Sequence, residues 1–308
     1  MFPFASGSGA VTAPLGAAAG LAAALCWTLA SLLWRRVPTS LTAAQLNLLK
    51  NLLALAMQLP LVLLTPWTAS GGAVAFLALS GIVGIALGDS LFFASLRRLG
   101  TRRSLTLNAG GPGLTALVGF ALLGEVPRPD QWLGIVLISA AVVLVARQQV
   151  PDRPLVGLPT DGLGLSLGIG ALVCGSAGAL LSRAALLSGA LSPLQASTLR
   201  LGAAALIMAP LLAGMPRPGQ RPLPARRRWP TLLLATFLGT SLGIALQQAA
   251  LAGLPGGLAV ALLSTSPVMA LPLARLEGDH PGWMGWTAAL AALAGVSLVV
   301  GWPLGPGS

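Results

Sequence analysis

The chain has 308 residues, of which 55% are hydrophobic and 8% are charged, and it contains no tyrosine. Soluble globular domains carry about 25% charged residues, so this composition excludes an ordinary cytosolic enzyme, a disordered chain and a secreted disulfide scaffold. With a mean hydropathy of +0.85, the chain is predicted to lie in lipid. Lys and Arg outnumber Asp and Glu by 18 to 7, for a formal net charge of +11. In a membrane protein such an excess of basic residues is interpreted first as a mark of the cytoplasmic side, rather than as a sign of nucleic-acid binding.

Ten mostly apolar runs are long enough to cross a bilayer, because a spanning helix needs about 20 such residues. Turn residues and arginines separate the runs, and the longest separation extends from Met215 to Pro230. The predicted fold class is an all-α integral membrane protein with ten transmembrane helices. They lie near residues 14–33, 43–64, 73–95, 103–123, 131–147, 162–182, 193–214, 230–251, 256–275 and 283–302.

The arginines alternate with the predicted membrane side. Fourteen of them follow the odd-numbered runs, whereas only Arg128 and Arg183 follow even-numbered runs. The first twelve residues carry no Lys or Arg, so no cleavable signal peptide is expected. Because basic residues concentrate in cytoplasmic loops, the sequence predicts a multi-pass protein of the cell (inner) membrane with both termini on the non-cytoplasmic side.

The second half of the chain repeats features of the first at an offset near 150 residues. We therefore predict two homologous five-helix units, residues 14–147 and 162–302. Five is odd, so the second unit enters the membrane inverted, and inverted repeats place a substrate site at their interface near the bilayer midplane. Matching pairs include Lys50 and Arg200, Gly88 and Gly243, Pro112 and Pro267, and Trp132 and Trp286.

These residues also carry a family resemblance. The run from Gly88 to Leu96, with Pro112, Leu123-Gly124-Glu125 and Gly134, resembles the drug/metabolite transporter superfamily, as a ten-helix member with two EamA-type repeats. Weaker versions occur at Gly243 to Leu251, at Ser266-Pro267 and at Glu277-Gly278-Asp279, and Ile244 stands where the first repeat has Asp89. The resemblance implies a secondary transporter that exports amino acids or similar small metabolites. Relatives exchange nucleotide sugars or phosphorylated compounds.

Three ionisable residues lie deep in the predicted helices: Lys50, Asp89 and Arg200. A charge in hydrocarbon costs about 2.5–3.5 kcal/mol, so each is a functional candidate. Lys50 and Asp89 both lie about 12 Å from the same membrane side, at 1.5 Å per residue. They could form a static ion pair or take part in proton coupling, or Lys50 could snorkel to the interface. No acid is expected at the depth of Arg200, which could meet an acidic group of the substrate or snorkel.

Uncharged polar residues complete the predicted substrate cavity. Trp27 lies in mid-helix, whereas the other tryptophans lie near helix ends. Gln247 and Gln248 are consecutive and need partners in two directions, although lone polar groups also join helices to one another. The predicted cavity residues are Trp27, Lys50, Asp89, Asn108, Arg200, Gln247, Gln248 and Ser264.

Two related positions are predicted to interrupt helices. Gly111-Pro112 and Ser266-Pro267 occur at corresponding places in the repeats. Pro removes a backbone donor and Gly weakens a helix, so kinks or hinges are expected there. Glu125, at the end of the fourth run, is expected to form a surface ion pair with Arg128.

Other chemistries are poorly supported. Cys26 and Cys174 lie in separate apolar runs without metal-ligand spacing, and the single histidine, His280, is in a loop. No HExxH, GxSxG or GxxxxGK[ST] motif is present, so neither an enzyme, a cofactor, a metal site nor ATP-driven transport is predicted. Expected partners are a small-molecule substrate, the lipid bilayer, and a proton or substrate gradient. The alternatives are an exporter of drugs or cationic compounds, an exchanger of sugars or phosphorylated metabolites, a channel or scaffold, and a membrane-embedded enzyme.

Overall fold

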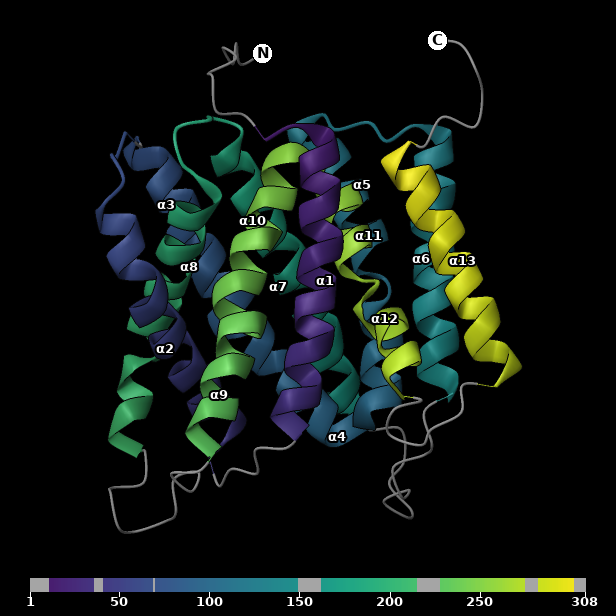
Figure 1. The fold of residues 1–308 in the computed structure, drawn as a ribbon, viewed down its shortest axis with the longest axis horizontal. Helices are drawn as coiled ribbons and strands as arrows, with labels where there is room; N and C mark the ends of the chain where they lie inside the picture. The colour runs from purple at the N-terminus through teal and green to yellow at the C-terminus, as the bar shows by residue number, and fades with distance from the viewer. Residues whose placement is uncertain are drawn as a thin grey trace.

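The computed structural model describes residues 11–35, 41–68, 70–148, 162–214, 228–274 and 282–301. Within these ranges the chain is helical, and nine stretches are long and apolar enough to cross a membrane. A tenth stretch, Gly256–Pro272, is a shorter apolar helix. The fold is therefore the ten-helix membrane bundle that the sequence predicts, built from two inverted five-helix repeats (Figure 1).

The helices of each repeat follow in the same order. In the first repeat they are α1 (Ala13–Arg35), α2 (Ala43–Leu63), α3 (Gly71–Ser80), the π-helix η1 (Gly81–Gly88), α4 (Asp89–Asn108), α5 (Gly111–Leu123) and α6 (Pro129–Gln148). In the second they are α7 (Gly162–Leu186), α8 (Pro193–Met208) with the 3₁₀ turn η2 (Ala209–Gly214), α9 (Trp229–Thr236), the π-helix η4 (Phe237–Leu242), α10 (Gly243–Gly253), α11 (Gly256–Leu263), α12 (Ser266–Ala274) and α13 (Trp283–Val300).

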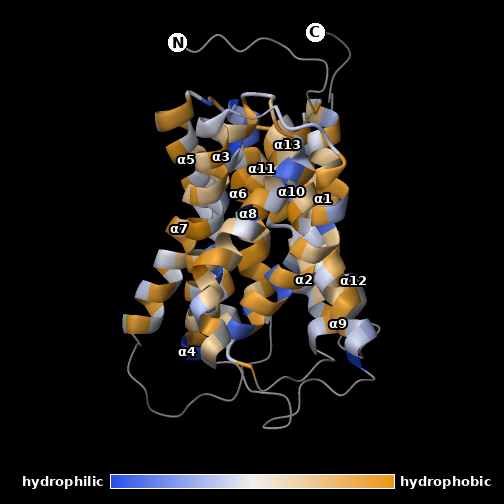
Figure 2. Ribbon diagram, turned by 90° about the vertical axis from the view of Figure 1, so that its left-hand side faces the viewer, coloured by the Kyte–Doolittle hydropathy of each residue, from blue (hydrophilic) through white to orange (hydrophobic). Residues whose placement is uncertain are grey.

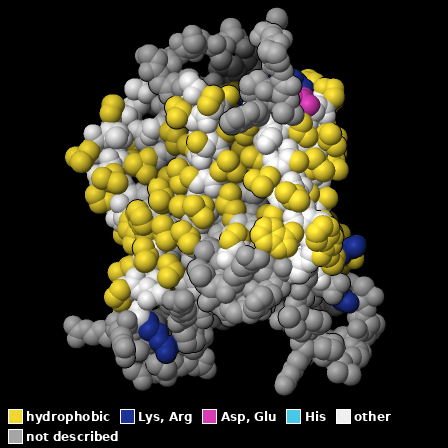
Figure 3. Space-filling view, turned by 45° about the vertical axis from the view of Figure 1, so that its right-hand side comes forward, with side chains coloured by type: hydrophobic (Ala, Val, Ile, Leu, Met, Phe, Trp, Pro, Cys, Tyr) yellow, Lys and Arg dark blue, Asp and Glu magenta, His cyan; other side chains and the backbone are white. Residues whose placement is uncertain are grey.

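Many large apolar side chains of the bundle are exposed, and many of its buried residues are small. Leu122 is 74% exposed and Leu206 is 76% exposed, whereas Ala141 and Ala288 are fully buried. Figure 2 shows hydrophobic residues along most of the helices, with some hydrophilic residues inside the bundle. In Figure 3 hydrophobic side chains cover the middle of the visible face, and the Lys, Arg, Asp and Glu side chains drawn in colour lie towards its ends. Exposed apolar side chains suit lipid as the surrounding solvent. Buried small residues let transmembrane helices approach each other closely.

Helices of one repeat pack on the equivalent helices of the other. Helix α6 packs on α13 and α2 packs on α8, while α5 packs on α11, which belongs to the equivalent span although α12 is the direct counterpart of α5. Helix α1 packs on α9, η4 and α10 of the second repeat, as α7 packs on α3, η1 and α4 of the first. Figure 1 shows α6 and α13 side by side at one edge of the bundle, and α2 and α8 towards the other. The repeats are thus related by an approximate two-fold axis.

Reciprocal contacts show this axis at single residues. Asn47 and Gln58 of α2 correspond to Ser197 and Met208 of α8. Asn47 Nδ2 lies 3.8 Å from Met208 Sδ, and Gln58 Nε2 donates to Ser197 Oγ at 2.9 Å. Each contact is therefore the repeat-related copy of the other. Such exchange of partners is what a two-fold interface requires.

The third and fourth spans of the first repeat are joined by helical residues rather than by the predicted break at Arg97 to Gly100. Helix α4 continues through this region, yet Ser95 Oγ and Ser104 Oγ lie 3.2 Å apart. Nine residues of straight helix would separate them by about 13 Å. The chain therefore reverses direction between these two serines while its backbone stays helical.

Two kinds of helix interruption recur in both repeats. Helix α4 ends at Asn108 and α5 begins at Gly111, while α11 ends at Leu263 and α12 begins at Ser266. These are the positions where the sequence predicts kinks. The π-helices η1 and η4 also occupy corresponding places, directly before α4 and α10. A π-helix widens the turn and is frequent at functional sites.

Candidate functional site

The centre of the candidate site is an ion pair between α2 and α4. Lys50 Nζ lies 3.3 Å from Asp89 Oδ2 and 5.6 Å from the centre of the Phe93 ring. The Lys50 side chain is 17% exposed and the Asp89 side chain is 40% exposed. A carboxylate at this depth is stable only where it meets water or a partner. Lys50 is that partner for Asp89, and the carboxylate is still 40% exposed.

Arg200 lies on α8 at the position equivalent to Lys50, and it is almost fully buried. Its Nη1 donates to Gln247 Oε1 at 3.1 Å, whereas its Nε has no partner. Among the described residues no carboxylate forms an ion pair with Arg200, and Asp89, which pairs with Lys50, is the acid whose charge reaches it. The structure thus brings Lys50, Asp89 and Arg200 into one electrostatic group.

The π-helices create carbonyl groups that side chains must satisfy, since water is scarce at this depth. Asn47 Nδ2 donates to Ile85 O of η1 at 3.1 Å, and Gln58 Nε2 donates to Ser241 O of η4 at 2.7 Å. Trp27 Nε1 donates to Gly239 O of η4 at 2.9 Å. Trp27 is therefore anchored by its indole N–H, with the ring half-buried between α1 and η4.

The remaining predicted cavity residues have different surroundings. Gln248 is fully buried, and neither its amide nitrogen nor its oxygen has a partner. Asn51, one residue after Lys50, is buried in the same unpartnered state. Asn108 is exposed at the end of α4. Ser264 donates its hydroxyl to Val260 O at 2.8 Å, so it caps its own helix.

The four predicted hinge residues lie at the two helix interruptions. Gly111 and Pro112 are buried in the first turn of α5. Ser266 begins α12, and the hydroxyl of Thr28 on α1 donates to Ser266 O at 2.9 Å. Pro267 is partly buried beside it. Their location suits a hinge, and movement there stays a prediction.

Glu125 does not pair with Arg128, contrary to the sequence-based expectation. Arg183 Nε donates to Glu125 Oε1 at 2.7 Å, and the two side chains are only 12% and 11% exposed. Arg183 Nη1 also donates to Leu251 O and Ala252 O, while the N–H of Gly256 donates to Glu125 Oε2. Arg128 pairs with Asp130 instead. Distance along the chain misled the prediction, because Arg183 comes from the other repeat.

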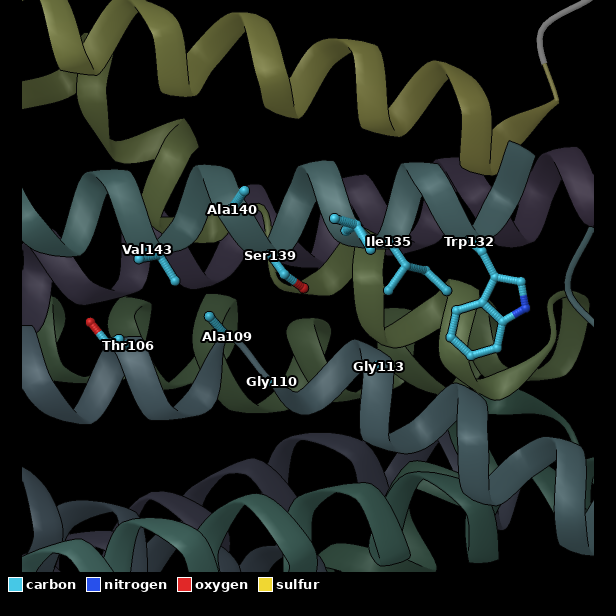
Figure 4. Close-up of a pocket in the computed structure, with 10 residues that line it drawn as sticks. Thr106, Ala109, Gly110, Gly113, Trp132, Ile135, Ser139, Ala140 and Val143 are labelled. Carbon is cyan, nitrogen blue, oxygen red and sulfur yellow. The ribbon is translucent and has the colours of Figure 1, made fainter. Parts of the chain in front are cut away.

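A separate groove of about 410 Å³ lies beside the α4–α5 interruption (Figure 4). Its walls are mainly apolar and come from α4, α5 and α6, with Trp132 at one end and Thr106 and Val143 at the other. None of the predicted cavity or hinge residues lines it. This groove is therefore distinct from the charged group around Asp89.

Sequence reasoning missed Gln58 and the π-helices. Asn47, Asn51 and Gln58 fall at spacings of four and seven residues, which puts them on one face of α2. That polar stripe in an apolar helix was the available signal for a buried hydrogen-bonded face. The π-helices leave no distinctive signal, because glycines like those of η1 and η4 also occur throughout the regular helix α7.

Comparisons with known proteins agree with this architecture. The EamA-like transporter family matches residues 14–147 and again residues 162–301. Among solved structures, one described only as a crystal structure of a protein is 17% identical, with a TM-score of 0.72. That similarity covers 92% of this chain and 95% of the other, and it supports the fold alone. Among the curated proteins compared, none matches the chain.

Proposed function

Because the chain belongs to the EamA-like transporter family, we propose that it is a secondary carrier that exports small organic metabolites, such as amino acids, across the cytoplasmic membrane. The family is one of membrane transporters, which supports transport of a small substrate. The observation that carries the proposal further is the Lys50–Asp89 ion pair, with its partly exposed carboxylate deep in an apolar bundle. Ionisable residues at this depth mark substrate or ion pathways.

Alternating access is supported by the two-fold relation between the repeats. Inverted repeats can pack in two nearly equivalent ways, and exchange between them opens the site to each side in turn. The exchange of partners between α2 and α8 brings the two repeats into contact along that axis. The interruptions at 109–110 and 264–265 give each repeat a place to bend.

Asp89 is the residue we propose to couple transport to a proton gradient. A carboxylate beside a lysine can either keep its ion pair with the lysine or bind a proton and release the lysine. The carrier thus has two charge states. The Asp89→Asn variant leaves Lys50 without its carboxylate partner, so it should unfold at a lower temperature than the unaltered protein but still fold. In proteoliposomes it should lose most of its proton-dependent, counter-gradient transport. Transport substrates would first be identified by a metabolite screen of cells that overproduce the protein.

Asp130→Asn is the matched control, because Asp130 is an exposed acid that pairs with Arg128 at the end of the bundle. It should transport like the unaltered protein. Proton dependence that persists in Asp89→Asn would contradict the coupling role. Flux that neither saturates nor runs against a gradient would contradict the carrier function and favour a channel.

A further inference from the structure

The charge of Arg200 is not balanced by a carboxylate of its own among the described residues. The residue is 3% exposed, and a guanidinium offers five N–H donors. One neutral acceptor, Gln247 Oε1, lies 3.1 Å from Nη1, and the buried Nε has no partner. Gly84 of η1 leaves room for the group, because a Cβ at Gly84 would lie 3.2 Å from Nη2. A buried cation without a counter-ion destabilises the folded protein, so an anion is expected to bind there.

The nearby charges do not supply it. Asp89 attracts Arg200, but the same carboxylate already lies 3.3 Å from Lys50 Nζ. Two cations therefore share one anion, and the group carries a net charge of +1. The other buried ion pair in the described chain, Glu125–Arg183, is neutral in itself.

We infer that the missing negative charge belongs to the substrate. The inference rests on the proposed carrier function and narrows it: the transported metabolite is an organic anion, and Arg200 with Gln247 binds its carboxylate or phosphate group. Arginine suits such groups because its planar donors match two oxygens at once. Gln247 holds the guanidinium in place while no substrate is bound. A cationic substrate would add a third positive charge to the group, which argues against an exporter of cationic compounds.

A first experiment measures binding by the thermal unfolding of the purified, full-length protein. The probes are four-carbon compounds that differ mainly in charge: butyrate and succinate as anions, 4-aminobutyrate as a zwitterion and putrescine as a cation, with inorganic phosphate to separate phosphate from carboxylate recognition. A ligand that binds only the folded state raises the unfolding temperature. We expect the anions to stabilise the unaltered protein and Arg200→Lys, and to lose their effect in Arg200→Gln. Equal stabilisation by putrescine, or anion effects that survive in Arg200→Gln, would overturn the inference.

A second experiment needs no ligand. Gln247→Glu is nearly isosteric and places a carboxylate on the existing partner atom of Arg200, so the protein supplies its own counter-ion. The unfolding temperature should rise by roughly 2–4 °C, and stabilisation by anions should disappear. Gln131→Glu makes the same change of charge at the surface, where Gln131 accepts a hydrogen bond from Arg128 N, and it should alter neither. An unchanged or lower unfolding temperature in Gln247→Glu would count against a surplus charge at Arg200.

The two proposals can fail separately. If proteoliposomes transport only neutral or cationic compounds, the carrier function stands and the anion site is wrong. If anions bind and Gln247→Glu stabilises the protein, but no compound crosses the membrane, the anion site stands and the carrier function is wrong.

Discussion

At the scale of single residues, burial decides what an ion pair contributes. Glu125 and Arg183 are nearly buried, whereas the side chains of Arg128 and Asp130 are 60% and 41% exposed at the same end of the bundle. Loss of one partner from a buried pair leaves an uncompensated charge, while an exposed pair is screened by water. Two ion pairs of similar geometry therefore have very different effects on stability.

Glu125→Gln should reduce the free energy of unfolding by roughly 3–5 kcal/mol, the usual effect of removing one partner of a buried pair. Arg128→Gln should leave it almost unchanged, because water screens the exposed Arg128–Asp130 pair. The double variant Glu125→Gln/Arg183→Gln should regain part of the loss, because no unpaired charge remains. Thermal or denaturant unfolding in detergent measures all three. Equal stability of Glu125→Gln and Arg128→Gln would contradict this account.

The sequence predicts a contact well when it depends on how deep each residue lies in the membrane. It predicts a contact poorly when it depends on which helices pack side by side. Counting residues from the helix ends put Lys50 and Asp89 at one level, and the structure places them 3.3 Å apart. The same counting does not show lateral packing, so the partner of Glu125 was assigned to nearby Arg128 rather than to Arg183, 58 residues away. The charge of Asp89 also reaches Arg200 across the repeat interface, which no count along one helix reveals.

At the scale of helices, close contact of backbones fixes how α6 meets α13. A Cβ at Gly134 would lie 2.7 Å from Gly295 O, and one at Gly295 would lie 2.8 Å from Gly134 O. The equivalent residues in the other repeat, Ala288 and Ala141, are fully buried in one cluster of the same interface. Glycine at positions 134 and 295 lets the backbones of α6 and α13 come into contact. At the repeat-related point of the same interface, the residues are alanines.

Gly134→Ala should lower the free energy of unfolding by roughly 1–3 kcal/mol, because the added methyl forces two backbones apart. Gly175→Ala on α7 is the matched control, since a Cβ there meets nothing within 4 Å. Alanine favours a helix over glycine, so this control should be neutral or slightly stabilising. The comparison is an unfolding measurement on both purified variants. A fully stable Gly134→Ala variant would show that α6 and α13 can separate without loss.

Helix interruptions divide into those with a residue signature and those without. Gly111-Pro112 and Ser266-Pro267 contain helix-weakening residues, and breaks occur beside both. The π-helices also contain glycines, but so does the regular helix α7, so these glycines do not mark them. The π-helices are recognised through the side chains that bind their carbonyl groups, such as Asn47 on Ile85 O. Composition therefore predicts where a helix breaks but not where its turn widens.

At the scale of the whole molecule, the two ends of the bundle differ in free positive charge. Arg97, Arg103 and Arg147 are exposed at one end. At the other end, Arg128 and Arg183 are each held by an acid. These ion pairs neutralise the two arginines at the second end. The difference in net positive charge between the two ends is therefore larger than the arginine count alone indicates. The positive end faces the cytoplasm in most membrane proteins. We therefore expect the end with Arg97, Arg103 and Arg147 to face the cytoplasm.

Ten spans return the chain to the side where it started, and Figure 1 shows the start of α1 and the end of α13 at the same end of the bundle. That end is the one with the paired arginines, so we predict that both termini face away from the cytoplasm. Alkaline phosphatase fused after the last residue should be active, and a fluorescent protein at the same place should stay dark. Fusions made after Gly214, which follows seven spans, should give the reverse result. Fluorescence from the C-terminal fusion would mean that the arginine-rich end faces outward, and it would contradict the predicted orientation.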